Sequence, residues 1–140
     1  MIKDNFNIAL DAFYANDFET AIKYFTIELE QNPNDEFTYL YRGISKSDLK
    51  DYSGAIDDYT KALEINPKSD DAYNNIGNAK LKLQNYLGAL QDFNKAIEIN
   101  SESSVTYKNR GKAKEKLRDF EGAKKDFEKA KELSWNDDKH

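Results

Sequence analysis

The fold is decided by residues 70–103, which read DDAYNNIGNAKLKLQNYLGALQDFNKAIEINSES. Apolar residues recur in this stretch at intervals of three and four, first over residues 73–77 and again over residues 86–97. This spacing places apolar side chains along one face of a helix, whereas a strand would alternate apolar and polar residues. The stretch is therefore predicted to contain two amphipathic helices.

The borders of these helices are marked by turn and capping residues. Residues 82–85 are polar enough to form a turn, and Asn85, which tolerates left-handed dihedral angles, is expected at the end of the first helix. Ser69 is predicted to cap the first helix, because acidic residues follow it in the first turn. Pro67 cannot continue the helix that precedes it. Each helix is expected to span about 13 residues.

The same pattern recurs along the chain with a period of 34 residues. All glycines, both prolines and several alanines and aromatic residues keep this interval. These positions are Gly43, Gly77 and Gly111; Gly54, Gly88 and Gly122; Ala21, Ala55, Ala89 and Ala123; Phe25, Tyr59, Phe93 and Phe127; Phe18, Tyr52, Tyr86 and Phe120; Pro33 and Pro67. A fixed period of this size is typical of a stacked repeat array. We expect one domain over residues 1–140, with units 2–35, 36–69, 70–103 and 104–137.

Three of the glycines, Gly43, Gly77 and Gly111, fall inside the predicted first helices. Glycine in a helix interior costs about 1 kcal/mol relative to alanine, so these positions need a structural reason. We expect them to leave room for the alanines of the paired second helix. A ligand role is not expected, because the sequence has no glycine-rich phosphate-binding motif.

Composition excludes several classes of function. With 140 residues, 39% of them hydrophobic, and a mean hydropathy of −0.91, the chain supports one modest core and no membrane span. It has no cysteine, and its one histidine is His140, so thiol chemistry, a Ser-His-Asp triad and a histidine zinc site are not expected. Sequential carboxylates such as Asp57 and Asp58 diverge on a helix and do not form a general acid–base pair. We expect a cytoplasmic protein that is not an enzyme and uses no cofactor or metal.

Over residues 2–137 the chain resembles the tetratricopeptide repeat family. The matching positions are Tyr39 and Gly43, Tyr73 and Gly77, Tyr107 and Gly111 in first helices, and Tyr52, Ala55, Tyr59, Ala62 and Pro67 in a second helix. The first unit departs from the family pattern, with Asn5 and Ala9 in place of the aromatic residue and the glycine. The resemblance implies an all-α, right-handed superhelix of four stacked helix-turn-helix repeats. It also implies a concave groove, lined by first helices, that binds a peptide segment of a partner protein.

The groove-facing residues of the first helices change in character along the chain. They are apolar in the first two units, rich in asparagine in the third and basic in the fourth. The candidate groove residues are Phe6, Leu10, Leu40, Tyr41, Ile44, Asn75, Asn78, Lys82, Lys108, Asn109, Lys112 and Lys116. Residues 104–118 carry six basic residues and one acidic residue, although the whole chain has a net charge of −5. This asymmetry favours an acidic segment or a C-terminal carboxylate as the ligand at that end.

Other interpretations of these surfaces remain open. The apolar residues can close the core of the first unit, or the patch of Phe6, Leu40 and Ile44 can be buried between copies of a self-associating scaffold. Nucleic-acid binding by the basic segment is a third and less favoured alternative, because the net charge is negative. The family's clamp for the C-terminal Glu-Glu-Val-Asp tail of chaperones is not expected, since apolar residues occupy most of the required lysine, asparagine and arginine positions.

The two ends of the predicted array carry charge where the interior units do not. Lys124 and Lys131 occupy positions at which earlier second helices direct apolar residues toward the following unit. Asp4 and Asp11 occupy the matching positions of the first helix, where the third unit has alanine. Because burying these charges without partners is costly, we expect them to form the solvated end faces of a complete four-repeat array.

Overall fold

The computed structural model describes residues 3–138 and forms two compact units, Met1–Pro67 and Lys68–His140. We call them the first unit and the second unit and describe each by itself. The predicted start of the first repeat at residue 2 and the histidine at position 140 lie outside the described residues.

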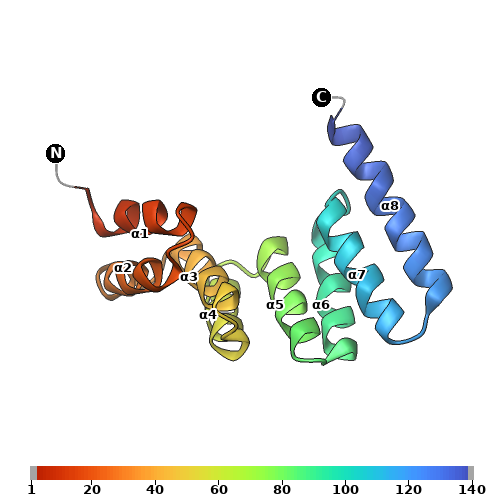
Figure 1. Ribbon diagram of the computed structural model, residues 1–140, viewed down its shortest axis with the longest axis horizontal. Helices are drawn as coiled ribbons and strands as arrows, with labels where there is room; N and C mark the ends of the chain where they lie inside the picture. Colours follow the sequence, from red (N-terminus) through yellow and green to blue (C-terminus); the bar gives the residue numbers. More distant parts are fainter. Residues whose placement is uncertain (1–2, 139–140) are drawn as a thin grey trace. The chain divides into compact units, whose positions relative to one another are not determined.

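Each unit contains two consecutive helical hairpins, which Figure 1 shows in chain order. The first unit holds α1 (Asn5–Tyr14), α2 (Phe18–Gln31), α3 (Glu36–Asp48) and α4 (Tyr52–Ile65). The second unit holds α5 (Asp70–Lys82), α6 (Tyr86–Ile99), α7 (Ser104–Lys116) and α8 (Phe120–Asp138). Within each unit every helix packs against the next, and α1 also contacts α3, as α5 contacts α7. Residues 3–138 contain no strand, and the predicted all-α helical repeat fold is confirmed.

The turn inside every hairpin contains one left-handed residue that is not glycine. These residues are Asn16, Lys50, Gln84 and Arg118, with φ of 60°, 66°, 65° and 68°. The expectation that Asn85 ends the first helix of its hairpin is therefore wrong. Asn85 has a negative φ of −91° and caps α6, since its side-chain oxygen accepts a hydrogen bond from the Gly88 N–H at 3.0 Å.

Replacing Lys50 with glycine should raise the free energy of unfolding by about 0.5–1 kcal/mol. A side chain in the left-handed region costs roughly 1–2 kcal/mol, and the greater freedom of glycine in the unfolded chain offsets part of that gain. Lys61→Gly, in the interior of α4, should instead lower the free energy of unfolding by about 1 kcal/mol. Urea denaturation measures both, and two shifts of the same sign would contradict the assigned turn geometry.

The glycines of the first helices contact aromatic rings. A Cβ atom added to Gly77 would lie 2.6 Å from Cε1 of Phe93, and one added to Gly43 would lie 2.5 Å from Cε1 of Tyr59. Gly111 meets Phe127 in the same way, at 2.7 Å. The expectation that alanines occupy this space is therefore wrong, since the ring of the second helix lies directly on the backbone of the first.

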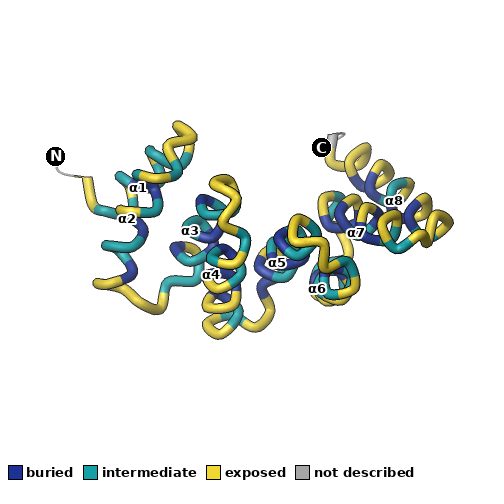
Figure 2. Tube along the Cα trace, turned by 60° about the horizontal axis from the view of Figure 1, so that its bottom comes forward, coloured by how far each residue is buried: buried dark blue, intermediate teal, exposed yellow. Residues whose placement is uncertain are grey.

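The core of each unit follows from this close approach. Phe25 in the first unit and Phe93 in the second are fully buried. Phe25 clusters with Ala9 and Ala21, whereas Phe93 clusters with Ala89 of its own helix and Ala113 of α7. Figure 2 shows buried segments along the helices and exposed residues at the turns. Each unit therefore builds its core from second-helix aromatic residues that contact small residues of neighbouring helices.

Candidate functional site

The candidate groove residues divide between the two units. Phe6 and Leu10 lie on α1, and Leu40, Tyr41 and Ile44 lie on α3. The asparagines and lysines all belong to α5 and α7 of the second unit. We therefore treat them as two separate groups, one apolar and one polar.

The apolar group is largely engaged in contacts within the first unit. Leu40 is only 7% exposed, and the other four residues are half-buried. The Phe6 ring lies 6.1 Å from the ring of Phe25 and 6.3 Å from that of Tyr41. Tyr41 stacks on Phe25 at 5.9 Å with an interplanar angle of 13°. This arrangement favours closure of the core around the first hairpin, whose α1 has Asn5 and Ala9 in place of the usual aromatic residue and glycine.

Two aromatic residues outside the candidate set are more exposed than its members. Tyr14 at the end of α1 is 70% exposed, and Phe37 at the start of α3 is 58% exposed. A hydrogen bond with Tyr14, together with partial burial, raises the pKa of the Tyr41 hydroxyl. The periodicity places Tyr14 and Phe37 on the same face as the candidate residues. It does not indicate that these two rings are more exposed than the candidates.

The polar group of the second unit presents both amides and ammonium groups. Lys82, Lys108, Lys112 and Lys116 are exposed, and Asn75 and Asn78 are half-buried. Asn109 is only 8% exposed, and its Nδ2 donates a hydrogen bond to Oδ1 of Asn74 at 3.1 Å. The Asn109 amide therefore joins α7 to α5, while the lysine side chains remain available to a ligand.

Four members of the polar group line one pocket of about 350 Å³ in the second unit. They are Asn78 and Lys82 from α5 and Lys112 and Lys116 from α7. Leu81, Gln84, Tyr86 and Glu115 complete the lining. Three ammonium groups face one carboxylate, so the charged side chains of the pocket carry a net charge of +2. We call this feature the lysine pocket.

The remaining polar candidates lie outside the lysine pocket. Lys108 lines a neighbouring pocket of about 420 Å³ with Val105, Phe127 and Lys131, whereas Asn75 and Asn109 line neither. Tyr86 was missed by sequence reasoning, because it begins a second helix and the family groove is attributed to first helices. Its position directly after the turn brings it beside residues of α5 and α7.

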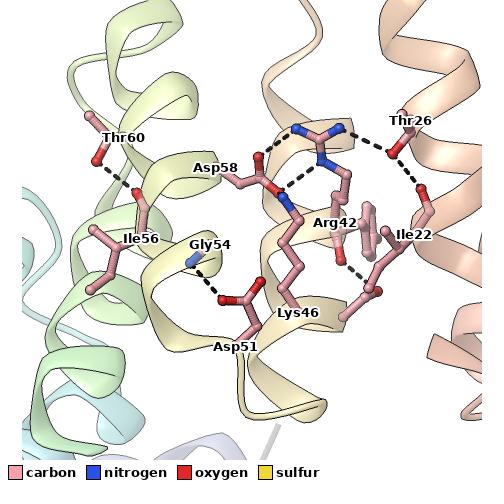
Figure 3. Close-up of polar contacts among 11 residues, drawn as sticks. Ile22, Thr26, Arg42, Lys46, Asp51, Gly54, Ile56, Asp58 and Thr60 are labelled. Carbon is pink, nitrogen blue, oxygen red and sulfur yellow. Dashed lines mark hydrogen bonds and ion pairs between the residues drawn. The ribbon is translucent and has the colours of Figure 1, made fainter. Parts of the chain in front are cut away.

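The most buried carboxylates belong to ion pairs between helices. Asp58 is 2% exposed and accepts two hydrogen bonds from Arg42, from Nε at 2.9 Å and from Nη2 at 2.7 Å. Lys46 Nζ lies 3.1 Å from Asp58 Oδ2, and Arg42 Nη1 donates to Thr26 Oγ1 at 3.2 Å (Figure 3). The hydrogen bonds that Arg42 donates to the Asp58 carboxylate raise the pKa of the Arg42 guanidinium. Asp57 is exposed, so the predicted divergence of this carboxylate pair is confirmed.

The second unit repeats this arrangement once completely and once in part. Arg110 donates to Asp126 at 2.9 Å and 2.7 Å, and Lys114 Nζ lies 3.1 Å from Asp126. The equivalent carboxylate of the preceding hairpin is Asp92, whose buried Oδ2 accepts no hydrogen bond and has only Lys80 Nζ, at 2.8 Å, as a countercharge among the described residues. These carboxylates form ion pairs between paired helices, and this structural role explains why they are buried.

Residues 3–138 contain no group of three or more His, Asp or Glu side chains placed to hold a metal ion. Within the same range, no helix has the length and apolar character needed to cross a membrane.

Apart from the start of α1 and the end of α8, the bounds of the hairpins recur every 34 residues, which defines an α-helical repeat protein. Three family models match the chain: a TPR repeat over residues 47–84 and tetratricopeptide repeats over residues 70–103 and 106–136. The chain belongs to the tetratricopeptide repeat family. No curated protein matches it significantly.

Several solved structures are similar to this chain over most of its length. The first TPR of Spaghetti (RPAP3), bound to the HSP90 peptide SRMEEVD, is 31% identical with a TM-score of 0.70, and the match covers 72% of this chain and 80% of that one. MamA is 20% identical with a TM-score of 0.88, covering 97% and 80%. The Arabidopsis OM64 TPR domain is 22% identical with a TM-score of 0.76, covering 79% and 92%. The last two similarities concern the fold alone.

Proposed function

We propose that this chain is a non-catalytic protein-interaction module that binds an acidic peptide segment of a partner protein at the lysine pocket. The observation that carries the proposal is the convergence of Lys82, Lys112 and Lys116 on one pocket, opposed by Glu115 alone. Ammonium groups that converge without matching carboxylates attract acidic side chains or a C-terminal carboxylate and increase the rate of association.

The pocket also contains groups that suit the rest of a peptide. Asn78 can both donate to and accept from a peptide backbone. Leu81 and Tyr86 provide apolar surface for the methylene groups of a glutamate or for a neighbouring apolar residue. The similar TPR domain of Spaghetti is bound to a peptide that contains two glutamates and ends in aspartate, which supports an acidic ligand as a class.

The first unit has a smaller part in this proposal. Phe6, Leu10 and Tyr41 already contact other side chains of their own unit, so less of their surface is available to a partner. The exposed rings of Tyr14 and Phe37 remain as anchors for an apolar portion of the same partner. We assign most of the binding energy to the lysine pocket.

Charge reversal of the pocket lysines should weaken binding of an acidic peptide at least about tenfold. The variant carries Lys82→Glu, Lys112→Glu and Lys116→Glu, and the probe is a fluorescent peptide rich in glutamate with a free C-terminal carboxylate. Fluorescence anisotropy measures the affinity, and circular dichroism checks that helicity is unchanged.

A matched control separates the pocket from net charge. Lys61→Glu, Lys95→Glu and Lys129→Glu change the net charge by the same amount but lie on second helices, beside glutamates three residues further on. The control should bind like the unmodified chain. Equal losses in both variants, or no binding by the unmodified chain, would refute the proposed site.

A further inference from the structure

The last helix carries two lysines on a face that other second helices use for packing. Lys124 and Lys131 are exposed, and neither has an ion-pair or hydrogen-bond partner among the described residues. The position of Lys131 corresponds, 34 residues earlier, to Ile97, which packs against the cluster containing Tyr107 of α7. With Phe127 between them, these lysines form what we call the α8 face. It is the surface by which a second helix meets the first helix of a following hairpin.

The first helix carries two aspartates on the matching opposite surface. Asp4 and Asp11 are exposed, and the half-buried Ile8 lies between them in sequence. We call these three residues the α1 face. The equivalent residues of α3 are Thr38, Arg42 and Ser45, and those of α7 are Thr106, Arg110 and Ala113. The α1 face is therefore the surface by which a first helix meets the second helix of a preceding hairpin.

Contacts inside each unit establish how two such surfaces meet. Arg42 of α3 donates to Thr26 of α2 at 3.2 Å, and Arg110 of α7 donates to Asn94 of α6 at 3.0 Å. The residues on either side of Arg42 at this surface, Thr38 and Ser45, are completely buried. These contacts give the register that the α8 and α1 faces would adopt if they packed together.

The charged residues of the two faces are opposite in sign and equal in spacing. In each, the charged residues stand seven positions apart, which corresponds to about 10.5 Å along a helix. One face has two lysines around Phe127, and the other has two aspartates around Ile8. We propose that the α8 face of one copy of this chain docks on the α1 face of a second copy. Successive helices in a hairpin array are antiparallel, so Lys124 lies opposite Asp11 and Lys131 opposite Asp4.

Other charged groups lie on or beside these two faces. Lys3 pairs with Asp11 within the chain, and this pair is exposed. Glu128 lies between the two lysines, at the position that Thr26 has in α2. Lys124, Lys131 and Glu128 together carry a net charge of +1, whereas Asp4, Asp11 and Lys3 together carry a net charge of −1. Lys3 and Glu128 are themselves of opposite sign.

Apolar surface around the lysines supplies the area that such a contact needs. One hollow of about 500 Å³ is lined by Lys131 and Trp135 together with Glu128 and Glu132, and Glu132 pairs with Lys129 at 3.9 Å. Another of about 350 Å³ is lined by Phe120, Lys124 and Phe127 together with Glu115, Glu128 and Lys131. Phe120 and Trp135 are 60% and 62% exposed. Burial of this surface contributes affinity, and the charges set the register and exclude other pairings. Because each copy has both faces, the contact is heterologous and repeats from copy to copy, so assembly is concentration-dependent.

The test compares two charge-reversed variants alone and mixed. The first carries Lys124→Glu and Lys131→Glu. The second carries Asp4→Asn and Asp11→Lys, because asparagine retains the cap of α1 that Asp4 forms with the Asn7 N–H. Sedimentation velocity over a concentration range of about a hundredfold should show association of the unmodified chain and at least about tenfold weaker association of each variant alone.

An equimolar mixture of the two variants should associate again, because each interface between unlike copies then contains at least one pair of opposite charges and no pair of like charges among the altered positions. A control with Lys125→Glu and Lys129→Glu, on other faces of α8, should associate like the unmodified chain. A strictly monomeric unmodified chain, undiminished association of either variant, or a mixture that stays monomeric would overturn the proposal. The lysine pocket is unchanged in all of these variants. The proposal of peptide binding and the proposal of self-association are therefore tested independently.

Discussion

Replacing Asp58 with alanine should lower the free energy of unfolding by about 3–5 kcal/mol. The carboxylate is almost completely buried and accepts two hydrogen bonds from Arg42 and an ion pair from Lys46. Its removal leaves two cations, each about one fifth exposed, without their shared countercharge. Because both cations keep part of their surface in contact with water, the solvent compensates for part of this loss. We therefore expect a value at the lower end of the range.

The neighbouring residue provides the control for this prediction. Asp57 is exposed on the same helix, and Asp57→Ala should change the free energy of unfolding by less than about 0.5 kcal/mol. Urea denaturation followed by circular dichroism measures both variants. Asp126→Ala should reproduce the Asp58 result in the second unit, where Arg110 and Lys114 make the same contacts. Similar stabilities for Asp57→Ala and Asp58→Ala would show that the ion pairs contribute little.

Replacing Gly77 with alanine should destabilise the second unit by about 1–3 kcal/mol, although alanine is the better helix former. The added Cβ would lie 2.6 Å from Cε1 and 2.8 Å from Cδ1 of Phe93. Phe93 is fully buried and cannot move away without displacing its neighbours Ala89 and Ala113. The strain of overpacking therefore exceeds the gain in helix propensity.

Gly88→Ala provides the matched substitution at the other series of glycines. Its Cβ would meet the side-chain amide of Asn85, a flexible group at the end of the helix, and not a buried ring. The chain already accepts a Cβ at the equivalent position of α2, where Thr20 donates its N–H to Asp17 at 3.3 Å. We expect the free energy of unfolding to change by less than about 0.5 kcal/mol, since the gain in helix propensity and the loss from a weakened cap nearly balance. Equal losses at Gly77 and Gly88 would contradict the ring contact.

Much of the fold could be predicted because its determinants are local and periodic. Apolar spacing predicted two helices in each 34-residue repeat, and Ser69 was correctly identified as a cap, since it accepts the Ala72 N–H at 3.1 Å. The turn was harder to predict in detail. A left-handed conformation at Gln84 has no residue signal, because glutamine does not favour it, whereas Asn85 suits both a left-handed turn and an N-cap.

The partners of individual side chains could not be predicted from periodicity. The recurring glycine indicated a close approach of two helices, but the spacing does not say whether an alanine or a ring fills the space. The apolar residues of α1 and α3 posed the same difficulty, because a core residue and a groove residue have the same spacing on an incomplete repeat. In the second unit, the common face of the lysines was predictable. The convergence of Lys82 with Lys112 and Lys116 depends on how α5 approaches α7, which requires coordinates.

The third hairpin differs from its neighbours in how its carboxylate is neutralised. Ile76 stands where Arg42 and Arg110 stand, so Asp92 depends on one amine, that of Lys80. Acetylation of Lys80 would leave this acid with no cation, whereas acetylation of Lys46 or Lys114 would leave an arginine in place. Among the three hairpins that contain this acid, the third is thus the one in which covalent modification of a lysine would leave the buried carboxylate without a countercharge.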